Sequence, residues 1–282
     1  MIIVTGASGR LGRAVVDRLA DRVATDQLGV SVRNPAKAAD LAARGVRVRR
    51  GDFGDPDSLA YAFEGATQVL IVSGPADPEP HHVAIDLAKT AGAGRILYTS
   101  HQAANLDSLF LATRGHAATE QDLADSGVPF TALRNGFYAS TPVYLLRSAL
   151  ATGELILPED GPFSWTAHRD LADAAVLALT DPGRLDGITP ALTGPELFDY
   201  ADIAAIASDL VGRKITRVAV PDEEWKQAAL GRGMPEFLVE LTLGIFAAAR
   251  RGEFAVVDPT LPTLLGRPTT TLREVLTAEL TT

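Results

Sequence analysis

Short apolar runs alternate with amphipathic helical patterns through the first half of this 282-residue chain. The runs predict strands near residues 2–5, 29–33, 46–50, 67–72, 95–99 and 129–133, with helices between them. The segment Val69–Val72 is apolar at every position, which is typical of a strand covered on both faces. Because strands and helices alternate in this way, we predict an α/β fold with a doubly wound parallel sheet.

The second half of the chain has a looser pattern. Proline and glycine interrupt it after Leu133, and a helical pattern resumes at Arg169–Leu179. Further helices are predicted near 200–211, 222–231 and 235–250, with short apolar pieces at Ile215–Val220 and Phe254–Val257. We expect a Rossmann domain at 1–138, to which 166–190 returns, and a smaller mixed α/β C-terminal cap made of 139–165 and 191–282. Trp165 and Trp225 are predicted to be packing residues.

Composition and charge exclude several classes of protein. Hydrophobic residues make up 46% of the chain and charged residues 22%, and no apolar run approaches the roughly 20 residues of a membrane span. The net charge of −9 and the lack of a basic run argue against nucleic acid as a partner. The absence of cysteine excludes disulfides, thiolate metal sites and a cysteine nucleophile. Because the first predicted strand begins at Ile2, leaving no room for a signal peptide, we expect a soluble, cytoplasmic protein with no membrane partner.

Three glycines at three-residue spacing follow the first predicted strand. The turn comprises Gly6, Ala7, Ser8, Gly9, Arg10, Leu11 and Gly12. Gly6 suits the tight turn, Gly9 leaves room for a pyrophosphate, and Gly12 lets the next helix approach the strand closely. The spacing alone is a weak signal, and a plain tight turn is the alternative, but the strand before it and the amphipathic helix after it favour a dinucleotide site.

The end of the second predicted strand indicates which dinucleotide is bound. An acidic side chain there accepts from a ribose 2′-hydroxyl, whereas an arginine accommodates a 2′-phosphate. This chain has Arg33 and Lys37 at that place and no carboxylate, so we predict NADP(H) as the cofactor. The alternative is that Arg33 and Lys37 are ordinary solvated surface charges.

The carboxyl ends of the other strands supply further candidate cofactor residues, because ligands of such sheets bind at that edge. They are Asp52 and Phe53 near the adenine, Ser73, Gly74 and Pro75 near the ribose and pyrophosphate, and Thr99, Ser100 and His101 toward the nicotinamide. A turn explains Asp52 almost as well. The neighbouring pair His81-His82, beside Asp77 and Glu79, lacks the spacing of a metal site and is predicted to be an exposed helix start.

With these residues in view, the chain resembles the atypical short-chain dehydrogenase/reductases. It is most similar to their NmrA-like group, in the branch of the type 2 quinone oxidoreductases and triphenylmethane dye reductases. The matching segments are Thr5–Gly12, Val32–Ala38, Leu123–Gly127, Leu133–Tyr138 and Gly266–Leu272. The resemblance implies that Gly6–Leu11, Arg33, Ser73–Pro75, the stretch from Phe137 onward and, more weakly, Arg169 line an NADPH site.

The resemblance fails at the catalytic pair of the wider superfamily. Enzymes that reduce ketones use Tyr-x-x-x-Lys, whereas Ala112 and His116 stand at those two places here. This argues against ketone reduction and sugar epimerisation. A quinone tolerates the loss, because hydride addition yields a hydroquinone anion whose charge spreads over the ring and is protonated readily. Positioning and a few donors near the developing oxyanion then suffice.

The candidate donors are His101, His116, Asn135 and Tyr138. Each has a structural alternative: His116 can pair with Glu120 on a helix surface, Asn135-Gly136 can form a turn with positive φ, and Phe137 and Tyr138 can pack between sheet and cap. An apolar stripe at 237–249 suits a cap core, a dimer face or the floor of a substrate pocket.

We therefore predict an NADPH-dependent reductase that transfers hydride to a quinone or similar electron-poor aromatic compound, acting as a monomer or homodimer without a metal. Two alternatives remain: an NmrA-like redox sensor that holds NADP without turnover, and a tailoring ketoreductase that uses another acid, such as His116.

Overall fold

The computed structural model describes residues 1–74, 76–181 and 183–280. Its centre is a parallel sheet of seven strands in the order β10-β6-β5-β4-β1-β2-β3. These strands are β1 (Ile2–Thr5), β2 (Leu28–Val32), β3 (Arg47–Arg50), β4 (Gln68–Ile71), β5 (Arg95–His101), β6 (Phe130–Asn135) and β10 (Gly187–Ile188). Strands β1 to β6 have the order of a Rossmann sheet, which confirms the predicted fold class.

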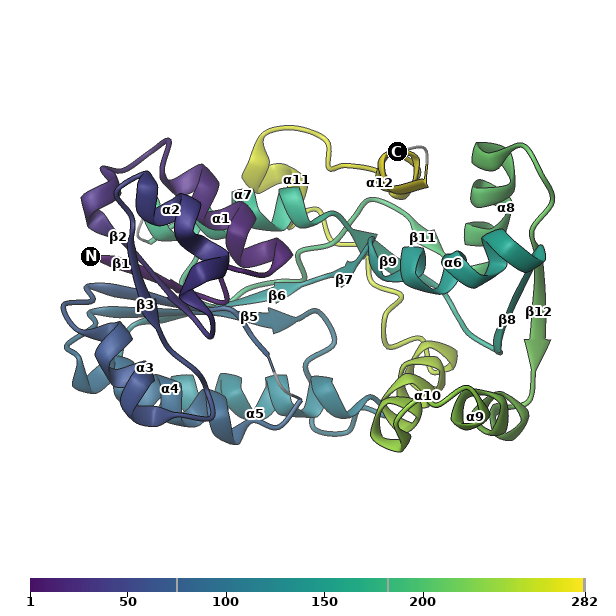
Figure 1. Cartoon of the computed structure of the whole chain (residues 1–282), viewed down its shortest axis with the longest axis horizontal. Helices are drawn as coiled ribbons and strands as arrows, with labels where there is room; N and C mark the ends of the chain where they lie inside the picture. The colour runs from purple at the N-terminus through teal and green to yellow at the C-terminus, as the bar shows by residue number, and fades with distance from the viewer. Residues whose placement is uncertain (75, 182, 281–282) are drawn as a thin grey trace.

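Helices cover both faces of this sheet (Figure 1). One face carries α1 (Arg10–Leu19), α2 (Ala39–Ala43), α7 (His168–Thr180) and α11 (Thr260–Leu265), with the one-turn 3₁₀ helices η1 (Thr25–Gln27) and η2 (Pro35–Ala38) in the loops around β2. The other face carries α3 (Pro56–Phe63), α4 (Glu79–Thr90) and α5 (Leu111–Asp125). The helix α1 shows why: its apolar stripe of Leu11, Val15, Val16 and Leu19 is buried in the sheet's core, and its polar positions face outward.

The remaining elements lie beyond the carboxyl ends of β5 and β6 (Figure 1). A three-stranded sheet contains β7 (Phe137–Tyr138), β9 (Phe163–Thr166) and β11 (Leu197–Phe198), and β8 (Glu154–Pro158) pairs in parallel with β12 (Thr216–Val220). Around them lie α6 (Thr141–Thr152), α8 (Tyr200–Val211), α9 (Asp222–Gly231), α10 (Glu236–Arg250) and α12 (Leu272–Leu280). A second core, rich in aromatic rings, holds most of these elements together, and α9 packs on α10 in a separate small cluster around Trp225.

The six predicted strands are confirmed, each within two residues of the observed bounds. The two-residue strands β7, β10 and β11 were not predicted, because so short a segment has no readable periodicity. Trp165 and Trp225 are 1% and 4% exposed, so the packing prediction is confirmed for both. The domain boundaries stay a prediction. No helix in the described part of the chain is long and apolar enough to cross a membrane.

Candidate functional site

The glycine turn between β1 and α1 has a shape that admits an anion. Gly6 has a φ of +62°, and a Cβ at Gly12 would lie 2.5 Å from the carbonyl oxygen of Gly6. The helix α1 begins after Gly9 with no side-chain cap and no acidic residue in its first turn. By contrast, Asp55 and Asp199 cap α3 and α8 with their carboxylates. The first N–H groups of α1 therefore remain available to a phosphate, which fits a dinucleotide.

The two predicted phosphate-binding cations lie just beyond β2. Arg33 follows the strand directly and Lys37 lies in η2, whose first turn Asn34 caps by accepting from the Ala36 N–H at 3.1 Å. Both side chains are exposed, and neither forms an ion pair with another described residue. Because a free phosphate site and a pair of solvated charges both look like this without the ligand, the assignment of Arg33 and Lys37 stays a prediction.

The candidates at the adenine end have different roles. Asp52 Oδ1 accepts from the Gly54 N–H at 3.0 Å, so the turn role foreseen as the alternative is present. Phe53 is half-buried, and its ring lies 3.8 Å from the point where a Cβ on Gly74 would sit. An adenine that enters beside Gly74 would therefore meet the Phe53 ring, whereas Asp52 is already committed to its own turn.

The loop after β4 is held by two side chains. The Ser73 N–H donates to Thr99 Oγ1 at 2.8 Å, and the Gly74 N–H donates to His81 Nε2 at 3.2 Å. His81 is only 2% exposed, so the prediction of an exposed helix start is wrong for this residue and holds only for its exposed neighbour His82. The third candidate of this loop, Pro75, lies outside the described residues. Within those residues, no group of His, Cys, Asp or Glu side chains is placed to hold a metal ion.

Ser100 requires a correction. Its side chain is 3% exposed and its hydroxyl donates to Glu120 at 2.6 Å. Glu120 in turn accepts two hydrogen bonds from Arg134, at 2.9 and 2.6 Å. The Ser100 side chain therefore belongs to a buried ion-pair network, although the residue itself lies near the carboxyl end of β5. The same network removes the predicted surface pair between His116 and Glu120, because Glu120 points to Ser100 and Arg134 instead.

Two histidines lie together at the carboxyl edge of β5. The His101 and His116 rings are nearly parallel, with centroids 5.9 Å apart and an interplanar angle of 22°. His101 Nδ1 accepts from the Ala103 N–H at 3.1 Å, and His116 Nδ1 lies 2.7 Å from the Tyr98 hydroxyl. Tyr98 was not among the sequence candidates. The signal was present, however, because a tyrosine in an otherwise apolar central strand brings a hydroxyl that needs a buried partner.

Burial governs the charge of these side chains. It lowers the pKa of His101 and of His116 to about 3, with the neighbouring histidines contributing in the same direction. Burial also raises the pKa of the Tyr98 hydroxyl. Both imidazoles are therefore neutral at pH 7, and each acts as a hydrogen-bond donor or acceptor without a positive charge.

Asn135 ends β6 directly opposite His101 in the sheet register. It is 3% exposed, and its Oδ1 is buried with no hydrogen-bond partner in the described structure. The glycine after it is not in a positive-φ turn, so that alternative is wrong. A Cβ on Gly136 would lie 2.1 Å from Thr166 Oγ1, which shows that close packing requires the glycine.

Phe137 and Tyr138 in β7 point to different surroundings. Phe137 is 8% exposed and packs against Trp165 and Phe254, so its packing alternative is present. The centroids of the Tyr138 and His168 rings lie 4.2 Å apart, and His168 is a residue that the sequence did not single out. Burial raises the pKa of Tyr138 and lowers that of His168 to about 4.

The glycine turn meets β7, α6, α7 and α12 at a pocket of about 290 Å³. Its lining comprises Arg10, Tyr138, Ser140, Val143, Tyr144, Arg147, His168 and Glu279. Arg10 pairs here with Glu279 of α12. The structure thus brings together two predicted site residues, Arg10 and Tyr138, that are 128 positions apart. Arg169 is largely exposed and its guanidinium lies 3.9 Å from Asp170, so its weaker assignment stays a prediction.

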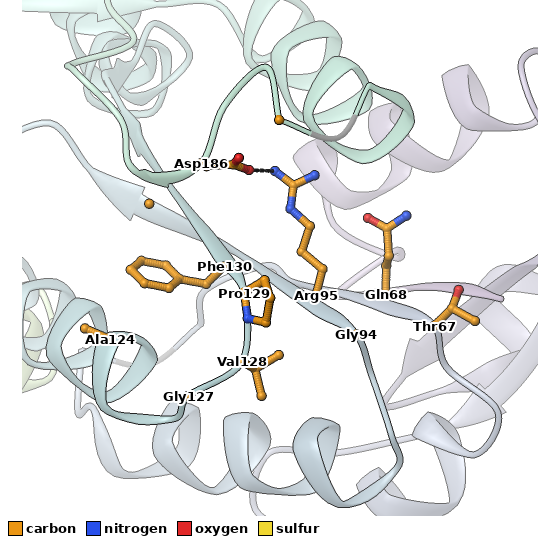
Figure 2. Close-up of a pocket in the computed structure, with 12 residues that line it drawn as sticks. Thr67, Gln68, Gly94, Arg95, Ala124, Gly127, Val128, Pro129, Phe130 and Asp186 are labelled. Carbon is orange, nitrogen blue, oxygen red and sulfur yellow. Dashed lines mark hydrogen bonds and ion pairs between the residues drawn. The ribbon is translucent and has the colours of Figure 1, made fainter.

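A larger hollow lies at the opposite edge of the sheet. Figure 2 shows this pocket of about 760 Å³, which residues at the starts of β4, β5 and β6 line. Its charged centre is Arg95, whose guanidinium donates to the carbonyl oxygens of Ala178 and Leu185, to Thr131 Oγ1 and to Asp186. These contacts commit the guanidinium to holding β5 and β6 against the segment after α7. In the same lining, Gln68 Oε1 is buried with no hydrogen-bond partner among the described residues.

Comparison with known families agrees with the geometry of the turn. Residues 6–182 match the model of a family described as NAD(P)H-binding. This chain belongs to that family, in the NmrA-like group of atypical short-chain dehydrogenase/reductases. The resemblance inferred from the sequence is confirmed, as is an NAD(P)H cofactor.

Individual relatives cover nearly the whole chain. Quinone oxidoreductase 2 of Escherichia coli (strain K12) is 35% identical over 279 residues, which is 97% of this chain and 96% of the relative. A crystal structure of the NADPH-dependent quinone oxidoreductase from Escherichia coli, complexed with NADPH, has a TM-score of 0.91 at 33% identity and covers 99% of each chain. The triphenylmethane reductase of Citrobacter sp., complexed with NADP(H), has a TM-score of 0.90 at 32% identity and covers 99% of this chain and 100% of that one.

Proposed function

We propose that this chain is an NADPH-dependent reductase that transfers hydride to a quinone or a similar flat, electron-poor aromatic acceptor. The observation that carries the proposal is a pair of neutral imidazoles at the carboxyl edge: His116 stands where ketone reductases hold the lysine, and His101 ends β5 beside it. A site of this kind offers N–H donors but no strong acid. Relatives named as quinone and triphenylmethane reductases support the same acceptor class.

The chain's own residues bind and orient both reactants. The N–H groups at the start of α1 hold the pyrophosphate, and Arg33 and Lys37 hold the 2′-phosphate. NADPH supplies the hydride when it is bound. His101 and His116 stabilise the acceptor's oxygen as negative charge develops on it, which is worth most in a site that excludes water.

The ketoreductase alternative loses support from the structure. It requires an acid that protonates a localised alkoxide, and His116 was its candidate. Burial holds the pKa of His116 at about 3, so the side chain has no acidic proton to give at pH 7. A quinone does not need that proton in the hydride-transfer step, because its anion is delocalised over the ring.

The test follows the absorbance of NADPH in the presence of a simple quinone, with NADH run in parallel. We expect NADPH-selective decay. His116→Ala should lower the rate by about a hundredfold, as removal of one oxyanion donor does elsewhere. The exposed His82→Ala is the matched control and should keep the wild-type rate.

Tight NADPH binding without oxidation by quinones or dyes would contradict the proposal and favour the redox-sensor alternative. A cytoplasmic location and a monomeric or homodimeric state stay predictions, to be checked by fractionation and by light scattering.

A further inference from the structure

His101 and His116 share one feature that their sequence positions do not reveal. In each ring, Nδ1 has a hydrogen-bond partner: the Ala103 N–H for His101 and the Tyr98 hydroxyl for His116. Nε2 of each ring has no hydrogen-bond partner within residues 1–74, 76–181 and 183–280. The two rings are also nearly parallel.

The partner of His101 decides its tautomer directly. A backbone N–H is only a donor, so His101 Nδ1 must accept and carries no proton. The single proton of the neutral ring is therefore on Nε2. This assignment does not depend on any side chain.

The tautomer of His116 depends on Tyr98. The Tyr98 side chain is fully buried, and its hydroxyl lies 2.7 Å from His116 Nδ1, with the Thr119 hydroxyl as a second polar neighbour. The nearby Thr119 hydroxyl already donates to the Gly115 carbonyl at 2.9 Å. If His116 Nδ1 carried the proton, the phenolic O–H could donate only to the oxygen of the Thr119 hydroxyl, a weaker acceptor than an imidazole nitrogen. The favoured arrangement has Tyr98 donating to Nδ1, with the proton of His116 on Nε2.

We infer that Tyr98 is a positioning residue that holds His116 as the Nε2–H tautomer, so that His101 and His116 present two neutral N–H donors to the oxygen of the acceptor. The inference rests on the proposed reductase function. Tyr98 itself does not touch the acceptor.

The surrounding groups keep this pair neutral. His81 of α4 lowers the pKa of His116. Glu120 of α5 and Tyr138 of β7 raise the pKa of Tyr98. Neither neutral imidazole gives up its Nε2 proton, because that would leave an imidazolate. The hydride brings two electrons to the acceptor, the two N–H groups stabilise the resulting oxyanion, and water supplies the proton that completes the hydroquinone.

The first experiment reads the tautomers without any turnover. Protein labelled with ¹⁵N-histidine is studied at pH 7 by two-bond ¹H–¹⁵N correlation, with His101 and His116 assigned by loss of their signals in His101→Gln and His116→Gln. We expect both rings as Nε2–H tautomers. In Tyr98→Phe, which keeps the packed ring, His116 should become a mixture of tautomers while His101 stays unchanged. A wild-type His116 with its proton on Nδ1, or a His116 unaffected by Tyr98→Phe, would overturn the inference.

The second experiment measures hydride transfer in a single turnover of NADPH with a simple quinone. Tyr98→Phe should lower the rate about tenfold, a smaller loss than removal of a donor itself, while the KM for NADPH changes less than about twofold. The rate of the wild-type protein should be independent of pH between 6 and 8. Tyr61→Phe, an exposed tyrosine, is the control and should behave as wild type.

The two proposals fail in different ways. A wild-type protein that oxidises no NADPH would contradict the reductase function. An active wild-type protein whose Tyr98→Phe variant transfers hydride at the full rate would contradict the role of Tyr98 alone.

Discussion

The amino and carboxyl edges of the central sheet both have a pocket, and the larger pocket is not the one with the candidate binding groups. The amino edge has the larger hollow, about 760 Å³, yet its one buried cation, Arg95, is committed to four protein acceptors (Figure 2). At the carboxyl edge the cap leaves a pocket of only about 290 Å³. That edge also has the uncapped start of α1, the two imidazoles and the unpartnered oxygen of Asn135.

The difference shows that binding chemistry is indicated by polar groups whose hydrogen bonds are incomplete. In a parallel sheet, every helix that follows a strand starts at the carboxyl edge, so free N–H groups and strand-end side chains accumulate there. The amino edge receives the helix ends instead, and Arg95 bonds to its neighbours there, although Gln68 Oε1 at this edge is buried without a partner in the described structure. The comparison can be tested by perturbing each edge separately.

The largest effect is expected from Gly12→Ala at the carboxyl edge. The new Cβ would lie 2.5 Å from one backbone atom and 2.8 Å from another, neither of which can move without shifting the turn. NADPH affinity should fall about a thousandfold, or roughly 4 kcal/mol, as measured by calorimetry. Gly94→Ala is the matched change at the amino edge, where the nearest atom lies at an ordinary 3.7 Å, and it should bind NADPH normally. Equal losses in both variants would remove the distinction between the edges.

The next largest effect is expected at the amino edge, on stability alone. Arg95→Met removes the guanidinium donor from the Ala178 carbonyl and the Thr131 hydroxyl, and leaves the Leu185 carbonyl with Thr131 Oγ1 as its remaining donor. The free energy of unfolding should fall by about 2–4 kcal/mol in urea titrations. The KM for NADPH should be unchanged at a temperature where the variant is folded, and a raised KM would show that this edge takes part in binding.

A smaller and selective effect is expected from Arg33→Ala. Loss of one charge-assisted contact to the 2′-phosphate should cost about 1.5–3 kcal/mol, or roughly 10- to 100-fold in the dissociation constant for NADPH. Binding of NADH should stay the same, because it lacks that phosphate. Equal weakening for both cofactors would assign Arg33 to the common part of the ligand. Arg50→Ala, at the exposed arginine that ends β3, provides the control.

The smallest effect per site is expected from pH. The pKa of buried His101 is about 3 in the folded protein, against about 6.5 when unfolded. Below pH 6.5 the unfolded chain therefore binds a proton that the folded chain does not. Stability is complete above pH 6.5 and decreases toward pH 3, by on the order of 1 kcal/mol per pH unit for this group. Urea midpoints measured from pH 7 to pH 4.5 should fall less steeply for His101→Gln than for wild type. Identical slopes would contradict a buried, neutral His101 in the folded protein.

What could be predicted from the sequence was whatever depends on neighbouring positions. The strands β1 to β6, the glycine turn and the cations after β2 are local patterns of apolar residues, of glycine and of charge. A nicotinamide dinucleotide followed from the turn, and the comparisons agree, whereas the role of Arg33 and Lys37 in choosing NADPH stays a prediction. His101, His116 and Asn135 were found as candidates because they follow strands or stand at a motif position.

The remaining features depend on contacts between distant segments, and only the tertiary structure decided them. Ser100 points into the core, where its hydroxyl donates to Glu120, and His81 points inward to accept from the Gly74 N–H. No local pattern reveals either contact. The inferred tautomer of His116 depends on Tyr98, eighteen positions earlier, because folding places the phenolic hydroxyl 2.7 Å from His116 Nδ1. Local sequence determined that this protein has a phosphate-binding turn and an edge for chemistry. Long-range packing decided which side chains at that edge remain free, because only folding shows which polar groups have already found a partner.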